Sequence, residues 1–211
     1  MKTKIDMDSW DRLDYLRYFG SCEDPFFGVV VDVDCTIAYQ NCKEAGLSFF
    51  LYYMYESIKA INLVENFRYR LIDGGVWLFD KVHASTTVGR KDGSFGFAFF
   101  EYTDDFSGFV NKAKKEIAQV EKCSGLRADF NAKRQDVIHN TTLPWFSFKS
   151  IKHEKSFSPN ESIPKIAFGK FYNTGDKKLL PVSVNAHHGL VDAYHIAKYL
   201  EHFQQGLNKK L

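Results

Sequence analysis

Hydrophobic and polar residues alternate along several short stretches of the chain, and this alternation predicts β-strands. The stretch Phe26–Asp34 alternates and is rich in valine, so it predicts one strand. Two short strands are predicted on either side of the dipeptide Leu143-Pro144, at Val137–Asn140 and Trp145–Lys149. Three further pairs of stretches are joined by turn-forming residues and predict hairpins. These pairs are Phe67–Ile72 with Val76–Phe79, Ser85–Arg90 with Ser94–Tyr102, and Ile166–Tyr172 with Lys178–Ala186.

Apolar positions three and four residues apart predict four helices. The first follows the capping pair Asp8-Ser9, and the second, Phe49–Leu63, is apolar nearly all round and belongs in the centre of the protein. The others are predicted from Asp104 to about Lys122 and from about Val191 to Gln205, where Gly206 should end the helix. The pattern predicts an α/β (α+β) two-layer sandwich with a mixed, largely antiparallel sheet. With no repeat or linker visible, residues 1–211 should form a single domain.

Composition narrows the choice of partners and location. The 211 residues are 45% hydrophobic and 26% charged, as in an ordinary globular protein. A net charge of +2 gives no electrostatic reason to expect a nucleic-acid or membrane partner. The most apolar window, Leu47–Val64, is interrupted by Glu56 and Lys59 and predicts a buried helix rather than a membrane span. The polar start of the chain resembles no export signal, so we expect a cytoplasmic protein.

Cysteine and aromatic residues restrict the chemistry. None of the four cysteines forms a Cys-x-x-Cys pair, which argues against structural zinc and thioredoxin-like redox chemistry. The 20 phenylalanines and 11 tyrosines can fill a core and interfaces, or can wall a pocket for an aromatic small molecule. The sequence pattern leaves both uses open.

The candidate catalytic residues lie where the last predicted strand meets the last predicted helix. His187 and His188 are adjacent on the strand, so their side chains should point to opposite faces. The residues alone leave three interpretations open: a packed polar pair, a metal site, and a single histidine acting as general base. The metal site would draw on His187, His188, Asp192 and His195, which lack a compact set of ligands on one face.

The pattern His187-His188-x-x-x-Asp192 resembles the His-His-x-x-x-Asp-Gly motif of the coenzyme A-dependent acyltransferases. Its place near the end of a chain of this length is similar to that in the chloramphenicol acetyltransferase family. Other matching segments occur in the same order, so the resemblance runs from about Ser9 to Gln205. These segments are Trp10-x-Arg12, Leu143-Pro144-Trp145-x-x-Phe148, and Asp176-x-x-Leu179-Leu180-Pro181-Val182-Ser183-Val184.

The resemblance implies direct transfer of an acetyl group from acetyl-coenzyme A to a hydroxyl of a small-molecule acceptor, with chloramphenicol as the leading acceptor. It assigns His188 as the general base, a role suited to imidazole because that group titrates near neutral pH. It places Thr141 where the family has a serine that hydrogen-bonds the oxyanion, with Ser147 as the alternative in a shifted register. No metal and no nucleophilic cysteine are implied.

The resemblance also implies supporting contacts and an assembly. Asp192 should pair with Arg12 in a structural rather than catalytic role. Without the resemblance, Arg12 is equally an exposed helix charge and Thr141 an ordinary strand residue. Family members are homotrimers with active sites between subunits, so the resemblance implies a homotrimer in which coenzyme A enters a tunnel.

Besides Thr141, four positions depart from the family pattern. Ala193 replaces the glycine of the motif, where alanine would be strained if the position needed a positive φ. Phe19 replaces a tyrosine of the acceptor pocket, and His153 and Lys155 replace apolar pocket residues. These changes keep the base but alter the acceptor wall. Two alternatives therefore remain: an acetyltransferase of this fold for a different hydroxyl acceptor, and a non-catalytic binding protein that kept the fold.

Overall fold

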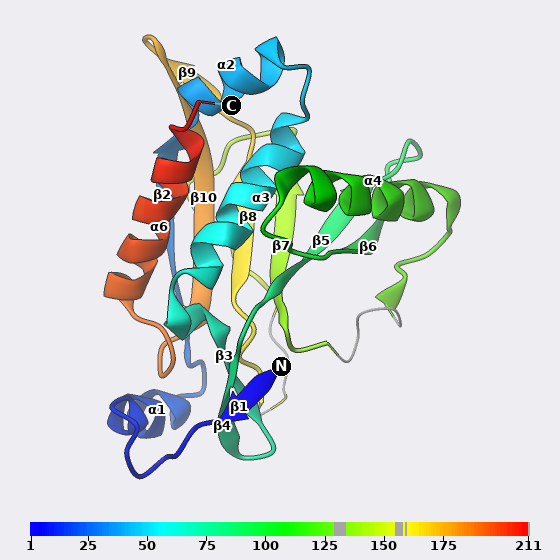
Figure 1. The fold of residues 1–211 in the computed structure, drawn as a ribbon. Helices are drawn as coiled ribbons and strands as arrows, with labels where there is room; N and C mark the ends of the chain where they lie inside the picture. Colours follow the sequence, from blue (N-terminus) through cyan, green and yellow to red (C-terminus); the bar gives the residue numbers. More distant parts are fainter. Residues whose placement is uncertain (129–133, 155–157, 159, 211) are drawn as a thin grey trace.

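The computed structural model describes residues 1–128, 134–154, 158 and 160–210. In this part of the chain a mixed seven-stranded sheet forms one layer, with the order β2-β10-β8-β7-β5-β6 and with β9 paired to β10 (Figure 1). Strands β5, β7 and β8 are parallel to one another, and the other neighbours are antiparallel. The strands are β2 (Phe26–Asp34), β5 (His83–Gly89), β6 (Phe95–Phe100), β7 (Val137–Leu143), β8 (Lys165–Gly169), β9 (Tyr172–Thr174) and β10 (Lys177–His187).

Helices form the second layer, and α3, α4 and α6 lie over the same face of the sheet (Figure 1). Helix α3 is buried nearly all round, as its apolar sequence predicts. The side chain of Asp105 caps α4 by accepting hydrogen bonds from the backbone N–H groups of Ser107 and Gly108. The helices are α1 (Leu13–Gly20), α2 (Thr36–Glu44), α3 (Phe49–Asn62), α4 (Phe106–Lys122) and α6 (Ala193–Leu207), with a 3₁₀ turn at Glu65–Arg68.

A smaller antiparallel sheet lies below the main one in Figure 1, in the order β1-β4-β3. It consists of β1 (Lys2–Lys4), β3 (Tyr69–Ile72) and β4 (Gly75–Phe79). The predicted hairpin is present because Asp73 and Gly74 take positive φ angles of 49° and 73° in the turn. None of the helices in the described ranges has both the length and the apolar character that a membrane crossing requires.

One helix was missed, and three predictions about the elements were wrong. Asp8-Ser9 does not cap the first helix, which begins at Leu13 after Arg12. Helix α2 was missed, because Cys35 gives it no side-chain cap and its buried residues are only Ala38 and Cys42. The strand predicted at Trp145–Lys149 is instead turn and coil, since Pro144 interrupts the ladder after β7. Gly206 does not end the last helix, which continues to Leu207. It lies inside the helix and packs so closely against the side chain of Glu56 that an added Cβ would overlap it.

Candidate active site

A tight turn connects β10 to α6 and fixes the two histidines. The backbone N–H groups of Leu190 and Val191 both donate to the carbonyl oxygen of His187, and the N–H of His188 donates to the carbonyl of Pro25 at 2.8 Å. Gly189 is required by close packing, since a Cβ there would lie 2.9 Å from the Cα of Leu16 in α1. The sequence therefore holds α1 directly against the turn.

His188 lies between two aromatic rings. Its imidazole is parallel to the ring of Phe19, with centroids 3.8 Å apart and an interplanar angle of 7°. The ring of Phe27 packs on it at 4.2 Å and 27°. The side chain is half-buried, and its Nδ1 is buried with no hydrogen-bond partner among the described residues. The stack restricts rotation of the ring and leaves Nε2 as the nitrogen that a substrate can reach.

His187 lies in a different environment from its neighbour, as strand alternation predicts. It is buried, its Nδ1 accepts a hydrogen bond from the N–H of Gly189 at 3.1 Å, and its ring meets Phe26 edge-on. Burial lowers the pKa of His187 to about 4. His187 is therefore neutral and packed at physiological pH.

Arg12 and Asp192 are in contact, and Arg12 is buried rather than an exposed helix charge. Arg12 Nη1 lies 3.0 Å from Asp192 Oδ2, and its other nitrogens donate to the backbone carbonyls of His188 and Gly189, each at 3.3 Å. Although burial acts to raise it, the hydrogen bond from Arg12 and nearby positive charge hold the pKa of Asp192 below its usual value. One guanidinium thus ties the start of α1 to the turn that carries His188.

Asp192 also caps helix α6. Its Oδ1 accepts hydrogen bonds from the N–H groups of Tyr194 and His195, while His195 Nδ1 accepts one from the N–H of Asp192. Ala193 is the exposed first residue of α6 and takes no positive φ, so the strain considered for it is not observed. In the described part of the chain, no group of three or more His, Cys, Asp or Glu side chains is placed to hold a metal ion.

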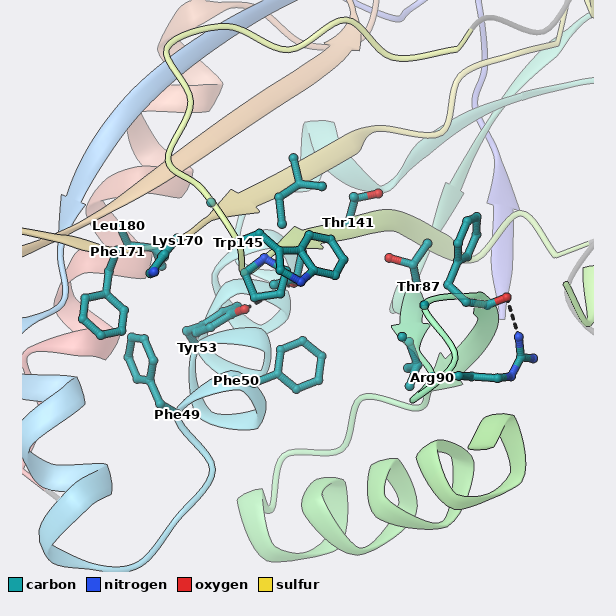
Figure 2. A pocket seen from close by; sticks show the side chains of 18 of the residues that line it. Phe49, Phe50, Tyr53, Thr87, Arg90, Thr141, Trp145, Lys170, Phe171 and Leu180 are labelled. Atoms are coloured by element: carbon teal, nitrogen blue, oxygen red, sulfur yellow. Dashed lines mark hydrogen bonds between the residues drawn. The ribbon is translucent and has the colours of Figure 1, made fainter. Parts of the chain in front are cut away.

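Thr141 lies elsewhere, in a large cavity at the carboxyl ends of the parallel strands β5, β7 and β8. The cavity has a volume of about 910 Å³ and is mainly apolar. Figure 2 shows Thr141 in its wall, with Tyr53 and Trp145 nearby and Lys170 beside Phe171. Ser147, the alternative to Thr141, is exposed and does not line this cavity.

His188 and Thr141 of one chain do not form one site. Thr141 pairs in register with Ala167 of β8, which pairs with Ser183 of β10. His188 comes five residues after Ser183, and two strand spacings separate β10 from β7. At standard strand dimensions the two Cα atoms are about 20 Å apart. His188 is also not among the residues that line the large cavity.

His153, predicted to bind the acceptor, lines a second cavity of about 140 Å³. Glu154 lines both cavities, so the two are adjacent. Phe19, the other predicted acceptor residue, packs on His188. Lys155 lies outside the described residues.

The sequence interpretation missed Phe27 and most of the aromatic lining of the large cavity. Phe27 had a signal: alternation in β2 places Phe26 and Phe27 on opposite faces, and β2 pairs with the strand that ends at His187. The lining aromatics Phe49, Trp145 and Phe171 come from separate segments, and only the fold brings them together.

Comparison with known proteins first identifies the fold. A solved structure described as a probable dihydrolipoamide acetyltransferase from Listeria monocytogenes aligns with 97% of this chain and 94% of its own, with a TM-score of 0.65. At 12% identity this likeness shows a shared fold.

Closer matches identify the family. A solved chloramphenicol acetyltransferase aligns with a TM-score of 0.92 at 27% identity, covering 98% of this chain and 100% of the other. A chloramphenicol acetyltransferase from Campylobacter coli is 28% identical over 210 residues, covering 98% of this chain and 99% of its own. The family model for chloramphenicol acetyltransferase matches residues 1–204. The chain belongs to the chloramphenicol acetyltransferase family and is an acyltransferase of this coenzyme A-dependent class.

Proposed function

We propose that this acyltransferase moves the acetyl group of acetyl-coenzyme A to a hydroxyl of chloramphenicol, with His188 as the general base. The observation that carries the proposal is the clamped imidazole of His188, held between Phe19 and Phe27 at the strand–helix turn of a chain that matches the family throughout. A base of this kind is worth about 10²–10⁴ in rate.

The proposed chemistry is a direct transfer. His188 Nε2 takes the proton of the acceptor hydroxyl as its oxygen attacks the thioester carbonyl. The hydroxyl of Thr141 donates a hydrogen bond to the oxyanion of the tetrahedral intermediate. When the carbon–sulfur bond breaks, the imidazolium returns its proton to the leaving thiolate, giving the acetyl ester and coenzyme A. Arg12 and Asp192 act through His188 by fixing the turn that carries it.

The large cavity fits the coenzyme A part of the substrate. The long, mainly apolar wall of the cavity is suited to the pantetheine arm. The rings of Phe49 and Phe171 are suited to stacking on adenine. Lys170 lies exposed at its edge, where an ammonium group can meet a phosphate. Arg90 is less available, because its guanidinium donates to the carbonyls of Val120, Phe95 and Gly125. We assign the coenzyme to this cavity, with its thioester beside Thr141.

The separation of about 20 Å between His188 and Thr141 supports an active site shared between chains. A hydrogen bond spans about 3 Å, so both residues can serve one transfer only if they come from different subunits. The exposed rings of Trp145 and Phe146 are suited to such a contact. By resemblance to the family, we propose that the assembly is a homotrimer.

A mixing experiment tests the shared site. His188→Ala and Thr141→Val chains, each nearly inactive, are unfolded together and refolded. If each site combines two chains, about a quarter of the sites in an equal mixture regain both residues, and activity returns. A mixture that stays as inactive as its components, although sedimentation shows mixed trimers, would contradict the shared site.

The transfer itself is tested by following coenzyme A release with a thiol reagent. Wild-type protein with acetyl-coenzyme A and chloramphenicol should release coenzyme A at a rate that depends on both substrates. Release of coenzyme A with other hydroxyl compounds but not with chloramphenicol would show that the acceptor is a different compound. No release with any acceptor at high protein concentration would indicate a binding protein instead.

A further inference from the structure

The backbone turn that carries the proposed base, residues 187–190, has four consecutive carbonyl groups, and each of them accepts a hydrogen bond. The first accepts from backbone N–H groups just after it in the chain. The second and third accept from the guanidinium of Arg12. The fourth, on Leu190, accepts from the side-chain amide of Asn66 at 3.0 Å. Two side chains from distant segments therefore hold this histidine turn, and neither the sequence pattern nor the resemblance pointed to Asn66.

Asn66 lies in the 3₁₀ turn after α3, and the residues that follow it are firmly anchored. Phe67 is fully buried, and its ring packs against Tyr199 of α6 with centroids 5.6 Å apart. Arg68 donates to the backbone carbonyl of Phe79, at the end of β4, at 2.8 Å. Because the 3₁₀ turn is attached to both α6 and the small sheet, it presents the amide of Asn66 from a fixed support.

The same 3₁₀ turn also supports the segment that carries Arg12. Tyr69, directly after the 3₁₀ turn, meets the ring of Trp10 edge-on with centroids 5.3 Å apart. Trp10 lies two residues before Arg12. Tyr69 Oη donates to Glu65 Oε1 at 2.6 Å, which ties the tyrosine back to the start of the 3₁₀ turn. One short segment thus supports both of the side chains that hold the histidine turn.

The position of the histidine turn sets the position of the imidazole of His188. The two rings that stack on this imidazole belong to other elements, Phe19 to α1 and Phe27 to β2. A shift of the histidine turn would therefore move the imidazole relative to both rings and relative to the acceptor hydroxyl. A misplacement of about 1 Å can lower the rate of a reaction about 10²-fold.

We infer that Asn66 is a positioning residue for the transfer, because its amide holds the histidine turn and so keeps Nε2 of His188 aimed at the acceptor hydroxyl. The inference rests on the proposed function, since that function makes His188 the base. Asn66 acts through the carbonyl of Leu190 and lines neither cavity. Loss of its amide should therefore slow the chemical step and leave the binding of acetyl-coenzyme A unchanged.

Asn66→Ala removes the amide and tests the inference by kinetics. Asn66 is half-buried, so we expect the variant to fold, which circular dichroism checks. It should lower kcat about tenfold with the KM for acetyl-coenzyme A unchanged. Asn66→Gln keeps an amide and should regain most of kcat. A purely structural role would lower stability but leave the kcat of folded chains unchanged, so wild-type kcat in folded Asn66→Ala would overturn the inference.

Asn62 provides the matched control. Its Nδ2 donates to the backbone carbonyls of Ile58 and Val82 at 2.9 Å each, so Asn62→Ala also loses bonds from an amide to the backbone, but away from the histidine turn. This variant should lose stability and keep the kcat of folded protein. An equal fall of kcat in the two alanine variants would show that the effect is not specific to Asn66, and would overturn the inference.

An NMR measurement decides the inference without turnover. The ring of His188 lies between the faces of Phe19 and Phe27, whose ring currents shift the signals of its protons. With ¹³C-labelled histidine, Asn66→Ala should move the ring signals of His188, and Asn62→Ala should not. If the wild type releases no coenzyme A, the proposed transfer fails, yet these signals still test whether Asn66 places the imidazole. Identical His188 signals in wild type and Asn66→Ala would overturn the inference.

Discussion

The ring of Phe19 lies flat on the imidazole of His188, with 3.8 Å between centroids and 7° between planes. The contact joins the end of α1 to the turn after β10, two segments about 170 residues apart in the chain. It fixes the plane of the ring that the proposed mechanism uses as base.

Removing this stack should impair turnover more than stability. Phe19→Ala should lower kcat about tenfold to a hundredfold, because the imidazole gains freedom to leave the reactive orientation. Phe19→Tyr keeps an aromatic face and should retain most of kcat. Steady-state kinetics measure both variants, and circular dichroism checks that they are folded. Wild-type kcat in folded Phe19→Ala would show that the stack does not position the base.

The contact between Arg12 and Asp192 should be visible in stability. Asp192→Asn leaves the buried guanidinium without its counter-charge and should lower the free energy of unfolding at pH 7 by about 3 kcal/mol. The pKa of Asp192 is lowered in the folded protein, so its contribution is present above the ordinary carboxyl pKa of 3.8 and is lost as pH falls through the lower folded value. Denaturant unfolding should therefore show the difference between wild type and variant shrinking in acid. A difference that is unchanged at pH 3 would contradict this.

His187 should make the protein sensitive to mild acid. Its pKa is lowered by burial from 6.5 to about 4, so the unfolded chain binds the proton first as pH falls. The neutral ring therefore stabilises the protein above about pH 6.5, and about 3 kcal/mol is lost between there and pH 4. His187→Asn offers an oxygen in place of Nδ1 to the N–H of Gly189 and does not titrate. Urea unfolding across this range should give a shallower pH slope for the variant, and equal slopes would refute the assignment.

The proposed hydrogen bond from Thr141 to the oxyanion can be tested by substitution. Thr141→Val keeps the branched shape but removes the hydroxyl, and should lower kcat about 10²–10³-fold with little change in KM. Thr141→Ser retains the donor and should stay within a few-fold of wild type. Ser147→Ala serves as the matched control, since Ser147 is exposed and outside the cavity. A larger loss in Ser147→Ala than in Thr141→Val would transfer the role to Ser147.

Sequence reasoning recovered the parts of the fold whose signals are local. The Asp73-Gly74 turn and the apolar sequence of α3 each act within a few residues. It failed where tertiary contacts decide. Gly206, which was expected to end the last helix, lies inside it and packs closely against Glu56. Helix α2 has no side-chain hydrogen bond from its N-cap residue Cys35, and the sequence interpretation missed it.

In the candidate site too, sequence reasoning found the residues of local motifs and missed those that tertiary contacts bring together. The motif located His188 and Asp192, and resemblance named Arg12 as the partner of Asp192. Phe27, the second ring against His188, required the pairing of β2 with β10. The separation of His188 from Thr141 required the register of β7, β8 and β10, which no single segment of the sequence specifies.

The most direct measurement is the rate of coenzyme A release by His188→Ala, compared with wild type and with His202→Ala, under saturating acetyl-coenzyme A and chloramphenicol. The proposed mechanism predicts that His188→Ala lowers kcat about 10²–10⁴-fold and leaves the fold and acetyl-coenzyme A binding unchanged. His202→Ala, which changes a histidine on α6 outside both cavities, should turn over at the wild-type rate. Wild-type turnover by folded His188→Ala would contradict the assignment of the base and the mechanism built on it.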